Sequence, residues 1–472
     1  MATTRAAIAK VVFLAALTAA WLFHGSGVVR NEPERRIHIP EELTMPLQVK
    51  AAYDGERIFF RYRWPAERPH LYHDLLRYED GGWRRVGQST VGPQEQGIYE
   101  DRVSMMVDDG RVPDFDRYGG FVTIGRQMRF FTDQADREAV SEHPYLGETK
   151  GKHDVRKFLP ATRRNPADWA TVVPPDKLAA LRETGYFLDL WHWRAHRSNP
   201  IGESDDQFIA EYRYGDAGQG PYSTNWDKEA EQPEWMFDPE EVGFRALDWN
   251  AIAERRLGFD DIYYLREGTA VPFDPEYDWQ EGDTIPRRLL RAPEGSRGDV
   301  SVAGEARWRD GYWNVTLVRQ LDTGHPLDDK AFEHGGVYWA AMAVHRNATG
   351  SRWHYVSLPV TVGLGHSAAI ETVRFSDGSP AWRQPWHELT LFYPGQLNWP
   401  LINSDRHAGA EQVAEGVPVR ARHTPGQLAH YAVEMEFNRA ILRNWLWTLI
   451  AGVLLIAGFG VALVRTLRQR ET

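Results

Sequence analysis

Hydrophobic and polar residues alternate with a period of two along much of the middle of the chain. Such alternation places successive side chains on opposite faces of a strand. Two of the alternating runs turn back at an Asp-Gly pair, Asp54-Gly55 and Asp310-Gly311, which is a common signal for a tight hairpin turn. The runs that predict strands are residues 48–65, 102–108, 186–194, 299–319, 336–346 and 353–363. Short strands with Gly and Asp turns between them predict a mainly β protein, built as an antiparallel β-sandwich.

Some stretches of the middle do not follow this pattern. We expect long insertions where proline and charge accumulate, near residues 160–180, 228–245 and 270–296. Residues 366–436 show little periodicity of any kind. The expected organisation is therefore a sandwich domain at residues 30–365, followed by a connector at residues 366–440.

An uncharged apolar run, Asn444–Val464, lies close to the C-terminus. About 20 apolar residues are needed for a helix to cross a bilayer. Trp445 and Trp447 lie at one end of the run, where an interfacial belt is expected, and three basic residues follow the other end: Arg465, Arg468 and Arg470. Residues 441–472 therefore predict a C-terminal transmembrane helix with a cytoplasmic tail.

A shorter apolar run, Val11–Phe23, follows Arg5 and Lys10 near the N-terminus. It fits a cleaved signal peptide, and it also fits an uncleaved N-terminal transmembrane helix that extends to Val29, so residues 1–29 are an anchor or a signal segment. Both alternatives place the middle of the chain outside the cytoplasm. We expect a protein of the bacterial inner membrane whose main domain is periplasmic.

The composition excludes several kinds of metal and cofactor site and argues against one class of partner. The chain of 472 residues contains no cysteine, which excludes disulfides, cysteine zinc sites, iron–sulfur clusters and covalently attached haem. The net charge is −11 and no long basic run is present, which argues against nucleic acid as a partner. There are 19 Trp, a number that favours strands or pockets that stack on flat ligands.

The densest group of chemically active residues lies in one predicted strand, Asp189–Arg197. Trp191 and Trp193 should point to one face of this strand, and His192 and Arg194 to the other. An imidazole can ligate haem iron and a guanidinium can pair with a propionate, so this group fits haem. The alternative is a histidine that only hydrogen-bonds within a polar face of the sheet.

Other side chains offer further ligands. His354, in Arg352-Trp-His-Tyr, and His345, on the preceding strand, are each either ligands or structural histidines. Thioether ligands are offered by Met105, Met106 and Met128, although Met in a strand usually fills a core.

An acidic turn lies at residues 108–116 and contains four carboxylates: Asp108, Asp109, Asp114 and Asp116. Such a group can bind calcium, but the spacing is not that of an EF-hand, and a solvated loop is the alternative. The chain has no glycine-rich phosphate loop, no Gly-x-Ser-x-Gly and no His-Glu-x-x-His, so hydrolase and nucleotide-binding functions have no support in the sequence.

Several motifs spread over residues 45–365 resemble the ethylbenzene dehydrogenase-related haem-binding family. They are Asp189-Leu-Trp-His-Trp-Arg-Ala, Arg197-Ser-Asn-Pro, Gly282-Asp-Thr-Ile-Pro, Gly295-Ser-Arg-Gly-Asp, Asp310-Gly-Tyr-Trp-Asn-Val, Arg319-Gln-Leu-Asp-Thr-Gly and Arg352-Trp-His-Tyr-Val-Ser. The family includes the gamma subunits of ethylbenzene dehydrogenase and of similar molybdenum enzymes. The resemblance implies a β-sandwich that holds one b-type haem between a Met and a Lys.

The chain departs from the gamma-subunit pattern at the ligands. His354 stands where the family has its ligating Lys, so the resemblance makes His354 the first axial ligand, with His192 as the second and Met128 as its substitute. Val419-Arg-Ala-Arg-His423 has the spacing of a c-type haem motif without the cysteines. The chain is thus similar to a membrane-anchored member that carries no covalent haem.

Three functions remain open at this point. The first is electron transfer by a haem b outside the membrane, with a periplasmic or membrane oxidoreductase as partner and no catalysis by this chain itself. The second is a carbohydrate-type binding module that uses a row of exposed Trp. The third is an assembly subunit with a vestigial haem site. Histidines that converge on one cavity would favour the first function.

Overall fold

The computed structural model describes residues 44–87, 98–125, 135–346, 354–376, 378–393 and 433–469, together with a few positions between residues 7 and 18. Most of the strands belong to one large sheet, in the order β16-β18-β2-β1-β22-β21-β19-β5-β6-β7-β8. Three further strands pair beside this path: β17 with β18, β20 with β19, and β23 with both β1 and β20. The bounds of the fourteen strands are β1 (Thr44–Tyr53), β2 (Arg57–Pro65), β5 (Arg102–Asp108), β6 (Leu188–Arg194), β7 (Asp205–Ile209), β8 (Arg213–Gly215), β16 (Ser301–Val302), β17 (Arg307–Arg309), β18 (Tyr312–Gln320), β19 (Val337–His345), β20 (Tyr355–Val356), β21 (Val360–Leu364), β22 (Ile370–Arg374) and β23 (His387–Phe392).

The large sheet folds back on itself, so that its two halves pack face to face. Phe60 on β2 contacts Trp191 on β6 with ring centroids 5.5 Å apart, and Trp64 contacts Trp193 at 6.0 Å. These rings are fully buried in the main hydrophobic core. Large aromatic side chains fill the space between two sheet layers efficiently, because each removes much apolar surface from water. The prediction of a mainly antiparallel β-sandwich is confirmed.

The sheet extends beyond the expected end of the sandwich. β22 pairs in parallel with β1, and β23 pairs with β1 in antiparallel orientation. Both strands lie within residues 366–440, where the sequence led us to expect a connector. In β22 the buried Thr372 is polar and the exposed Val373 is apolar, so the burial of alternate residues leaves no alternation of apolar and polar residues in the sequence.

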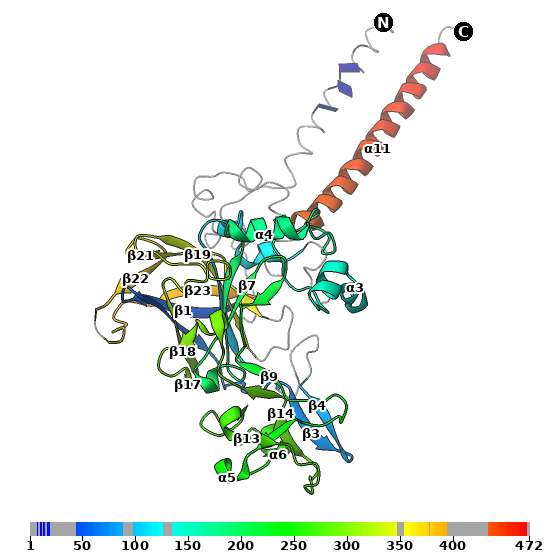
Figure 1. Ribbon diagram of the computed structural model, residues 1–472. Helices are drawn as coiled ribbons and strands as arrows, with labels where there is room; N and C mark the ends of the chain where they lie inside the picture. The colour runs from blue at the N-terminus through cyan, green and yellow to red at the C-terminus, as the bar shows by residue number, and fades with distance from the viewer. Residues whose placement is uncertain are drawn as a thin grey trace.

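A smaller lobe lies at the end of the sandwich remote from α11 (Val433–Arg468) (Figure 1). It consists of three small sheets and short helices, formed by residues 75–86 and by the chain between β8 and β16. Two of the expected insertions, near residues 228–245 and 270–296, belong to this lobe. Its elements are β3 (Leu75–Glu79), β4 (Gly82–Val86), β9 (Tyr222–Thr224), β10 (Trp235–Phe237), β11 (Leu247–Asp248), β12 (Leu265–Arg266), β13 (Ala270–Pro272), β14 (Asp283–Pro286), β15 (Arg288–Leu290), α5 (Pro239–Val242) and α6 (Trp249–Ala253).

Short helical segments cover the outer face of β5, β6 and β19. Phe115 and Tyr118 pack there on Leu188 and Leu190, in a hydrophobic cluster separate from the main core. This cover creates a second interior on the outer side of the sheet, and the candidate site lies in it. The helical segments of this region are α2 (Phe115–Tyr118), η2 (Gly119–Thr123), α3 (Arg137–Ser141), η4 (Pro144–Thr149), η5 (Pro160–Thr162) and α4 (Pro175–Glu183).

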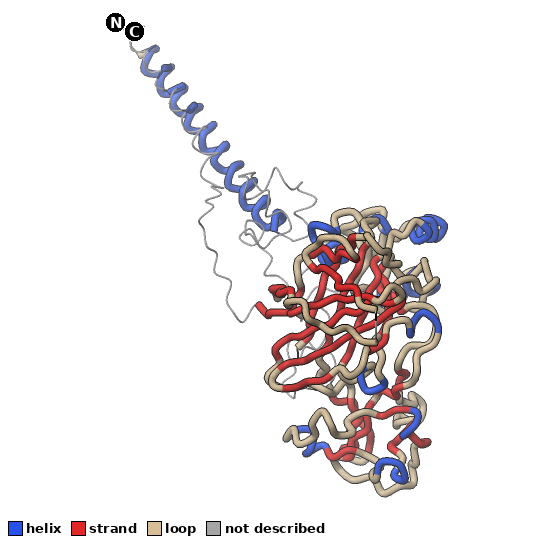
Figure 2. The backbone as a smooth tube through the Cα atoms, turned by 90° about the vertical axis from the view of Figure 1, so that its left-hand side faces the viewer, coloured by secondary structure: helices blue, strands red, loops and turns tan. Residues whose placement is uncertain are grey.

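The long helix α11 projects from the strand-rich body (Figures 1 and 2). Its segment Trp445–Arg468 has a mean hydropathy of 2.3 over its most apolar window and is long and apolar enough to cross a membrane. Its large apolar side chains are exposed. Exposed Leu, Ile and Val along a whole helix are costly in water and favourable in lipid, which is consistent with a membrane anchor.

Candidate functional site

The floor of a cavity is formed by three neighbouring strands of the sheet, β6, β5 and β19. Their register places Ser104 between His192 and Ala343, and Met106 next to Ala341. The middle of the floor therefore carries small side chains, and larger ones stand at its edges. A floor of this kind leaves room for a flat ligand to lie on the sheet.

The opposite wall comes from η2 and from the segment that contains Lys157. Gly119 adopts φ +50° and lies so close to β19 that an added Cβ would meet the Cβ of Ala341 at 3.1 Å. A glycine is required here because the backbone both has a positive φ and touches the sheet. The open space between floor and wall is about 700 Å³, including its mouth.

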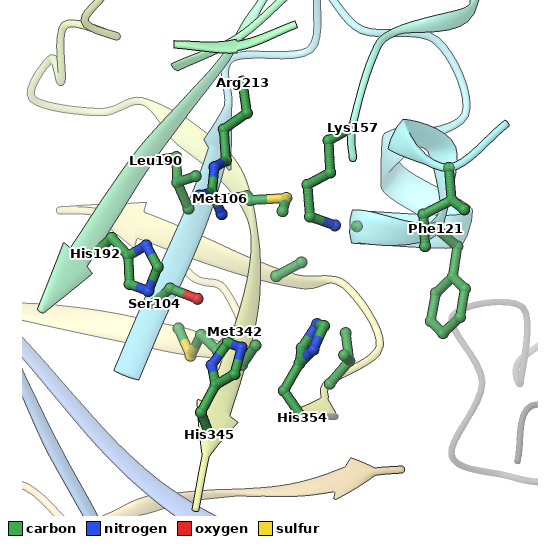
Figure 3. A pocket seen from close by; sticks show the side chains of 15 residues that line it. Ser104, Met106, Phe121, Lys157, Leu190, His192, Arg213, Met342, His345 and His354 are labelled. Atoms are coloured by element: carbon green, nitrogen blue, oxygen red, sulfur yellow. The ribbon is translucent and has the colours of Figure 1, made fainter. Parts of the chain in front are cut away.

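Three imidazole rings converge on this cavity (Figure 3). The rings of His345 and His354 stack with centroids 4.5 Å apart, and the rings of His192 and His345 lie 6.1 Å apart. All three residues are buried. The thioether of Met106 and the amine of Lys157 line the same space. The cavity thus collects nitrogen and sulfur donors of the kinds that ligate haem iron.

The hydrogen bonding of His192 fixes its tautomer. Nη2 of Arg194 lies 3.2 Å from Nδ1 of His192, and a guanidinium can only donate. Nδ1 must therefore accept, which leaves the ring proton on Nε2. This Nε2 is buried and has no hydrogen-bond partner among the described residues. The Nε2–H of His192 is consequently a buried hydrogen-bond donor that a ligand in the cavity could satisfy.

Burial and surrounding cations keep the imidazoles neutral. Burial lowers the pKa of His192 well below its usual value, and the positive charges of Arg194 and Arg213 lower it further. Burial likewise lowers the pKa of His345 well below its usual value, together with the neighbouring His354 and Arg102. Neutral imidazole is the form that binds a metal, so the ring of His345 needs no deprotonation to act as a ligand at pH 7.

The cavity is electropositive. Arg213 and Lys157 line it, and none of the described lining residues is Asp or Glu. Burial and the neighbouring Arg156 lower the pKa of Arg213 to about 10, so its guanidinium still carries a charge at pH 7. Positive charge without a lining carboxylate favours an anionic ligand, such as a molecule with carboxylate groups.

An ion-pair network on the face of the sheet that carries His192 holds Arg194 in place. Arg194 and Arg297 both bind the carboxylate of Asp205 on β7, which is fully buried. Gln207 donates to the same carboxylate at 2.7 Å. Since Arg194 in turn orients His192, Asp205 controls the geometry of the cavity without lining it.

The structure brings together some of the predicted site residues and separates others. His192 and His354 line one cavity, and Arg194 lies beside it. Trp191 and Trp193 lie on the opposite face of β6, buried in the core between the two layers. Met128 and the motif at residues 419–423 lie outside the described residues.

The acidic turn at residues 108–116 does not form a cluster of metal ligands among the described residues. Asp108 accepts from the backbone of Gly110 at 3.0 Å, and Asp109 pairs with Lys330 at 2.6 Å. The carboxylates of Asp108 and Asp109 are therefore engaged by the backbone and by Lys330.

Other lining residues were predicted only in part or not at all. Met106 was one of three possible thioether ligands, with core filler as the alternative, and it lines the cavity. Lys157 and Arg213 have no signal in the sequence, because they lie at or beyond the ends of regular elements. Their place in the cavity is set by tertiary packing alone.

The sequence model of the family described as ethylbenzene dehydrogenase matches residues 29–357. The matched range contains every residue that lines the cavity. No curated protein matches the chain.

Proposed function

This chain belongs to the ethylbenzene dehydrogenase family, and we propose that it is a membrane-anchored electron-transfer protein that holds one b-type haem in the cavity above β5, β6 and β19. The family indicates a haem-related or redox-associated protein. The observation that carries the finer proposal is the convergence of His192, His345 and His354 on one electropositive cavity.

The shape of the cavity suits a porphyrin. The floor carries Ser104, Ala341 and Ala343, whose small side chains leave a flat surface. The wall includes Phe121 and Ile124, which offer apolar contact to the other face of a flat ring. An apolar enclosure also tunes the potential of a haem, because it disfavours the form with the higher charge.

The ligands are proposed from the donors that the cavity contains. His354 remains the first axial ligand, since it follows the family motif and lines the cavity. Met106 takes the role that the sequence assigned to Met128, because its thioether lies in the same space (Figure 3). Lys157 is the alternative to Met106, and together the two provide the Met and Lys donor types that the resemblance implies.

His192 is assigned a different role from the one expected. A metal-bound histidine normally donates its second ring N–H to an acceptor. Here the partner of Nδ1 is the guanidinium of Arg194, which cannot accept. We therefore assign the Nε2–H of His192 to a haem carboxylate, beside the positive charge of Arg213, and not to the iron.

The proposed role follows from this site and from the anchor. A haem fixed between side-chain ligands transfers electrons without binding a substrate at the iron. Helix α11 would keep it near the membrane, where a larger oxidoreductase is the proposed partner. In this proposal the chain positions the haem and sets its potential, and it does not act as the catalyst.

A carbohydrate-binding function has less support. Stacking on a sugar requires aromatic rings that are accessible from solvent. Trp191 and Trp193 are fully buried and pack on other rings in the core. An assembly subunit with a vestigial site is the remaining alternative, and haem content decides between it and the electron-transfer proposal.

The test is an optical spectrum of the full chain, purified in detergent after expression with ample haem, before and after reduction by dithionite. We expect a pyridine haemochrome of b type and one haem per chain. His354→Ala and Met106→Leu should shift the Soret band or change the spin state, since each removes a ligand. His192→Gln should weaken haem binding while leaving the band positions unchanged.

The matched control is His325→Ala, because His325 is a half-exposed histidine far from the lining residues. It should leave both the spectrum and the stoichiometry unchanged. A colourless protein would refute the proposal and leave the assembly function. A spectrum that is insensitive to His354→Ala and Met106→Leu would refute the ligand assignment alone.

A further inference from the structure

Four aspartates from distant parts of the chain meet behind the sheet, on the side away from the haem cavity. Asp189 lies on β6, Asp206 on β7, Asp216 just after β8, and Asp329 in the loop that precedes β19. Oxygen atoms of Asp189, Asp206 and Asp329 lie within 4.8 Å of one another. All four side chains are buried, with exposed fractions of 0%, 0%, 3% and 5% in chain order.

Several of these carboxylate oxygens have no hydrogen-bond partner. Both oxygens of Asp216, Oδ1 of Asp189 and Oδ2 of Asp206 are buried without a partner among the described residues. Asp216 lies close to the other three aspartates, because the negative charges of Asp329 and Asp189 act on its carboxyl group and its own charge acts on Asp206. An unpaired buried carboxylate oxygen is costly, because it has lost its hydration without replacement.

The described cations do not balance this charge. Arg319 pairs with Asp189 at 2.6 Å and with Asp329 at 3.0 Å. The amine of Lys330 binds Asp109 at 2.6 Å, and Arg297 binds Asp205 at 2.5 Å, so both are engaged outside the cluster. Among the described arginines and lysines, only Arg319 forms an ion pair with the cluster, while Lys330 and Arg297 act on Asp189 and Asp216 from a greater distance.

We propose that Asp189, Asp206, Asp216 and Asp329 bind one divalent calcium ion. All the donors are carboxylate oxygens, which hard cations prefer. Calcium accepts an irregular set of six to eight oxygen ligands, whereas magnesium keeps several waters in a near-octahedral shell, for which a buried cluster of this kind has little room. The two charges of the ion offset the excess negative charge that Arg319 leaves.

The carboxyl groups of the cluster hold their protons more tightly than free carboxyl groups do. Burial raises the pKa of Asp216 to about 10, and the negative charges of Asp329 and Asp189 add to the effect. Burial also raises the pKa of Asp329, to about 7, against the opposing charge of Arg319. In the absence of a cation the cluster holds protons at pH 7, so calcium binding should release them.

A second group lies next to the first and offers different chemistry. Asp299 and His325 approach Asp329 from the surface, and His325 Nδ1 lies 2.7 Å from Asp299 Oδ2. An imidazole ligand favours zinc over calcium. Variants of Asp299 and His325 therefore show whether a bound metal lies in this neighbouring group and not in the cluster of four aspartates.

The experiment uses the full chain in detergent, stripped with EDTA and then dialysed against calcium chloride. We expect about one calcium per chain by mass spectrometry of the metal content. We also expect a rise in the melting temperature of roughly 5 °C at a calcium concentration 100 times the dissociation constant. Asp206→Asn and Asp216→Asn should each abolish both effects.

The controls are Asp116→Asn, an exposed carboxylate of the acidic turn, and Asp299→Asn, in the neighbouring group. Both should retain calcium binding. In EDTA, Asp216→Asn should melt close to the parent, because the raised pKa already leaves the Asp216 carboxyl group uncharged at pH 7. Calcium binding and thermal stabilisation are measured on the parent chain as well, so the proposal can be tested even if one variant folds poorly.

Three results would overturn the proposal. The first is a parent chain that calcium does not stabilise and that retains no calcium after dialysis. This result would mean that the carboxylate oxygens of the cluster share protons with one another. Calcium binding that survives both Asp206→Asn and Asp216→Asn would place the ion elsewhere. Binding of zinc alone, lost in His325→Ala, would assign the metal to the neighbouring group.

Discussion

Replacing Asp205 by Asn should destabilise the protein in a way that depends on pH. The substitution preserves the shape of the side chain and removes a buried charge that pairs with Arg194 and Arg297. Burial alone would raise the pKa of Asp205, but the two guanidinium groups outweigh it and lower the pKa to about 2, from an ordinary 3.8. This difference corresponds to about 2 kcal/mol of stability at pH 7.

The loss on mutation should be at least that large. Asp205→Asn leaves the buried guanidinium of Arg194 and the half-buried one of Arg297 without their counter-charge, and breaking a buried pair costs about 3–5 kcal/mol. We therefore expect the free energy of unfolding to fall by about 2–5 kcal/mol at pH 7. Urea unfolding followed by Trp fluorescence measures it, because Trp191 and Trp193 lie on β6 beside the affected pair.

The sign of the pH dependence follows from the lowered pKa. The stabilisation is present above the unfolded pKa near 3.8 and is lost as the pH falls towards about 2. At pH 3 the contribution of Asp205 should be about 1 kcal/mol, roughly half its value at pH 7. The difference between parent and Asp205→Asn should shrink accordingly.

The control for this series is Asp116→Asn, which removes an exposed carboxylate and should change stability by less than about 0.5 kcal/mol. A loss for Asp205→Asn below about 1 kcal/mol at pH 7, or an equal loss at pH 7 and pH 3, would refute the reasoning. Either result would mean that the buried guanidinium groups find other partners or solvent.

Further predictions concern the cavity, the core and the anchor. Ser104→Leu should fill the middle of the cavity floor and abolish haem binding, at a cost of about 1–3 kcal/mol in urea unfolding, whereas Ser104→Ala should retain haem. Trp64→Ala should cost about 3–5 kcal/mol, because the ring is fully buried against Trp193. A chain without Trp445–Arg468 and residues 1–29 should move from the carbonate-resistant membrane fraction to the soluble fraction, and persistence in the membrane would contradict the anchor.

Individual strands and hairpin turns could be predicted from the sequence, because short stretches of neighbouring residues determine them. The hairpin at Asp310-Gly311 forms where predicted, and both residues adopt positive φ, 51° and 78°, as a tight hairpin turn of this kind requires. The order of the strands could not be predicted in this way. β1 lies between β2 and strands more than 300 residues later, and nothing in a short window encodes that pairing.

The same distinction applies to the candidate site. The period of two in β6 was sufficient to separate His192 from Trp191, and the structure places them on opposite faces of the sheet. It could not show which face meets the cavity or that Lys157 reaches it from an irregular segment. The aspartate cluster was missed for a related reason: Asp189 and Asp329 are far apart in sequence, and each alone resembles an ordinary polar position.

The proposed haem cavity and the proposed calcium site lie on opposite faces of β6, which leads to a last prediction. β6 carries Asp189 on one face and His192 on the other, and β7 carries Asp205 beside Asp206. Removal of calcium should loosen these strands and with them the Arg194 contact that orients His192.

This coupling is measurable as the rate at which haem passes from the full chain to an excess of a haem-scavenging apoglobin. We expect EDTA to raise this rate by at least about 5-fold, the lower end of typical couplings between sites. Asp216→Asn should show the fast rate with or without EDTA, while Asp116→Asn should behave as the parent. Equal rates in calcium and in EDTA, in a chain shown to bind calcium, would mean that the two faces of β6 are energetically independent.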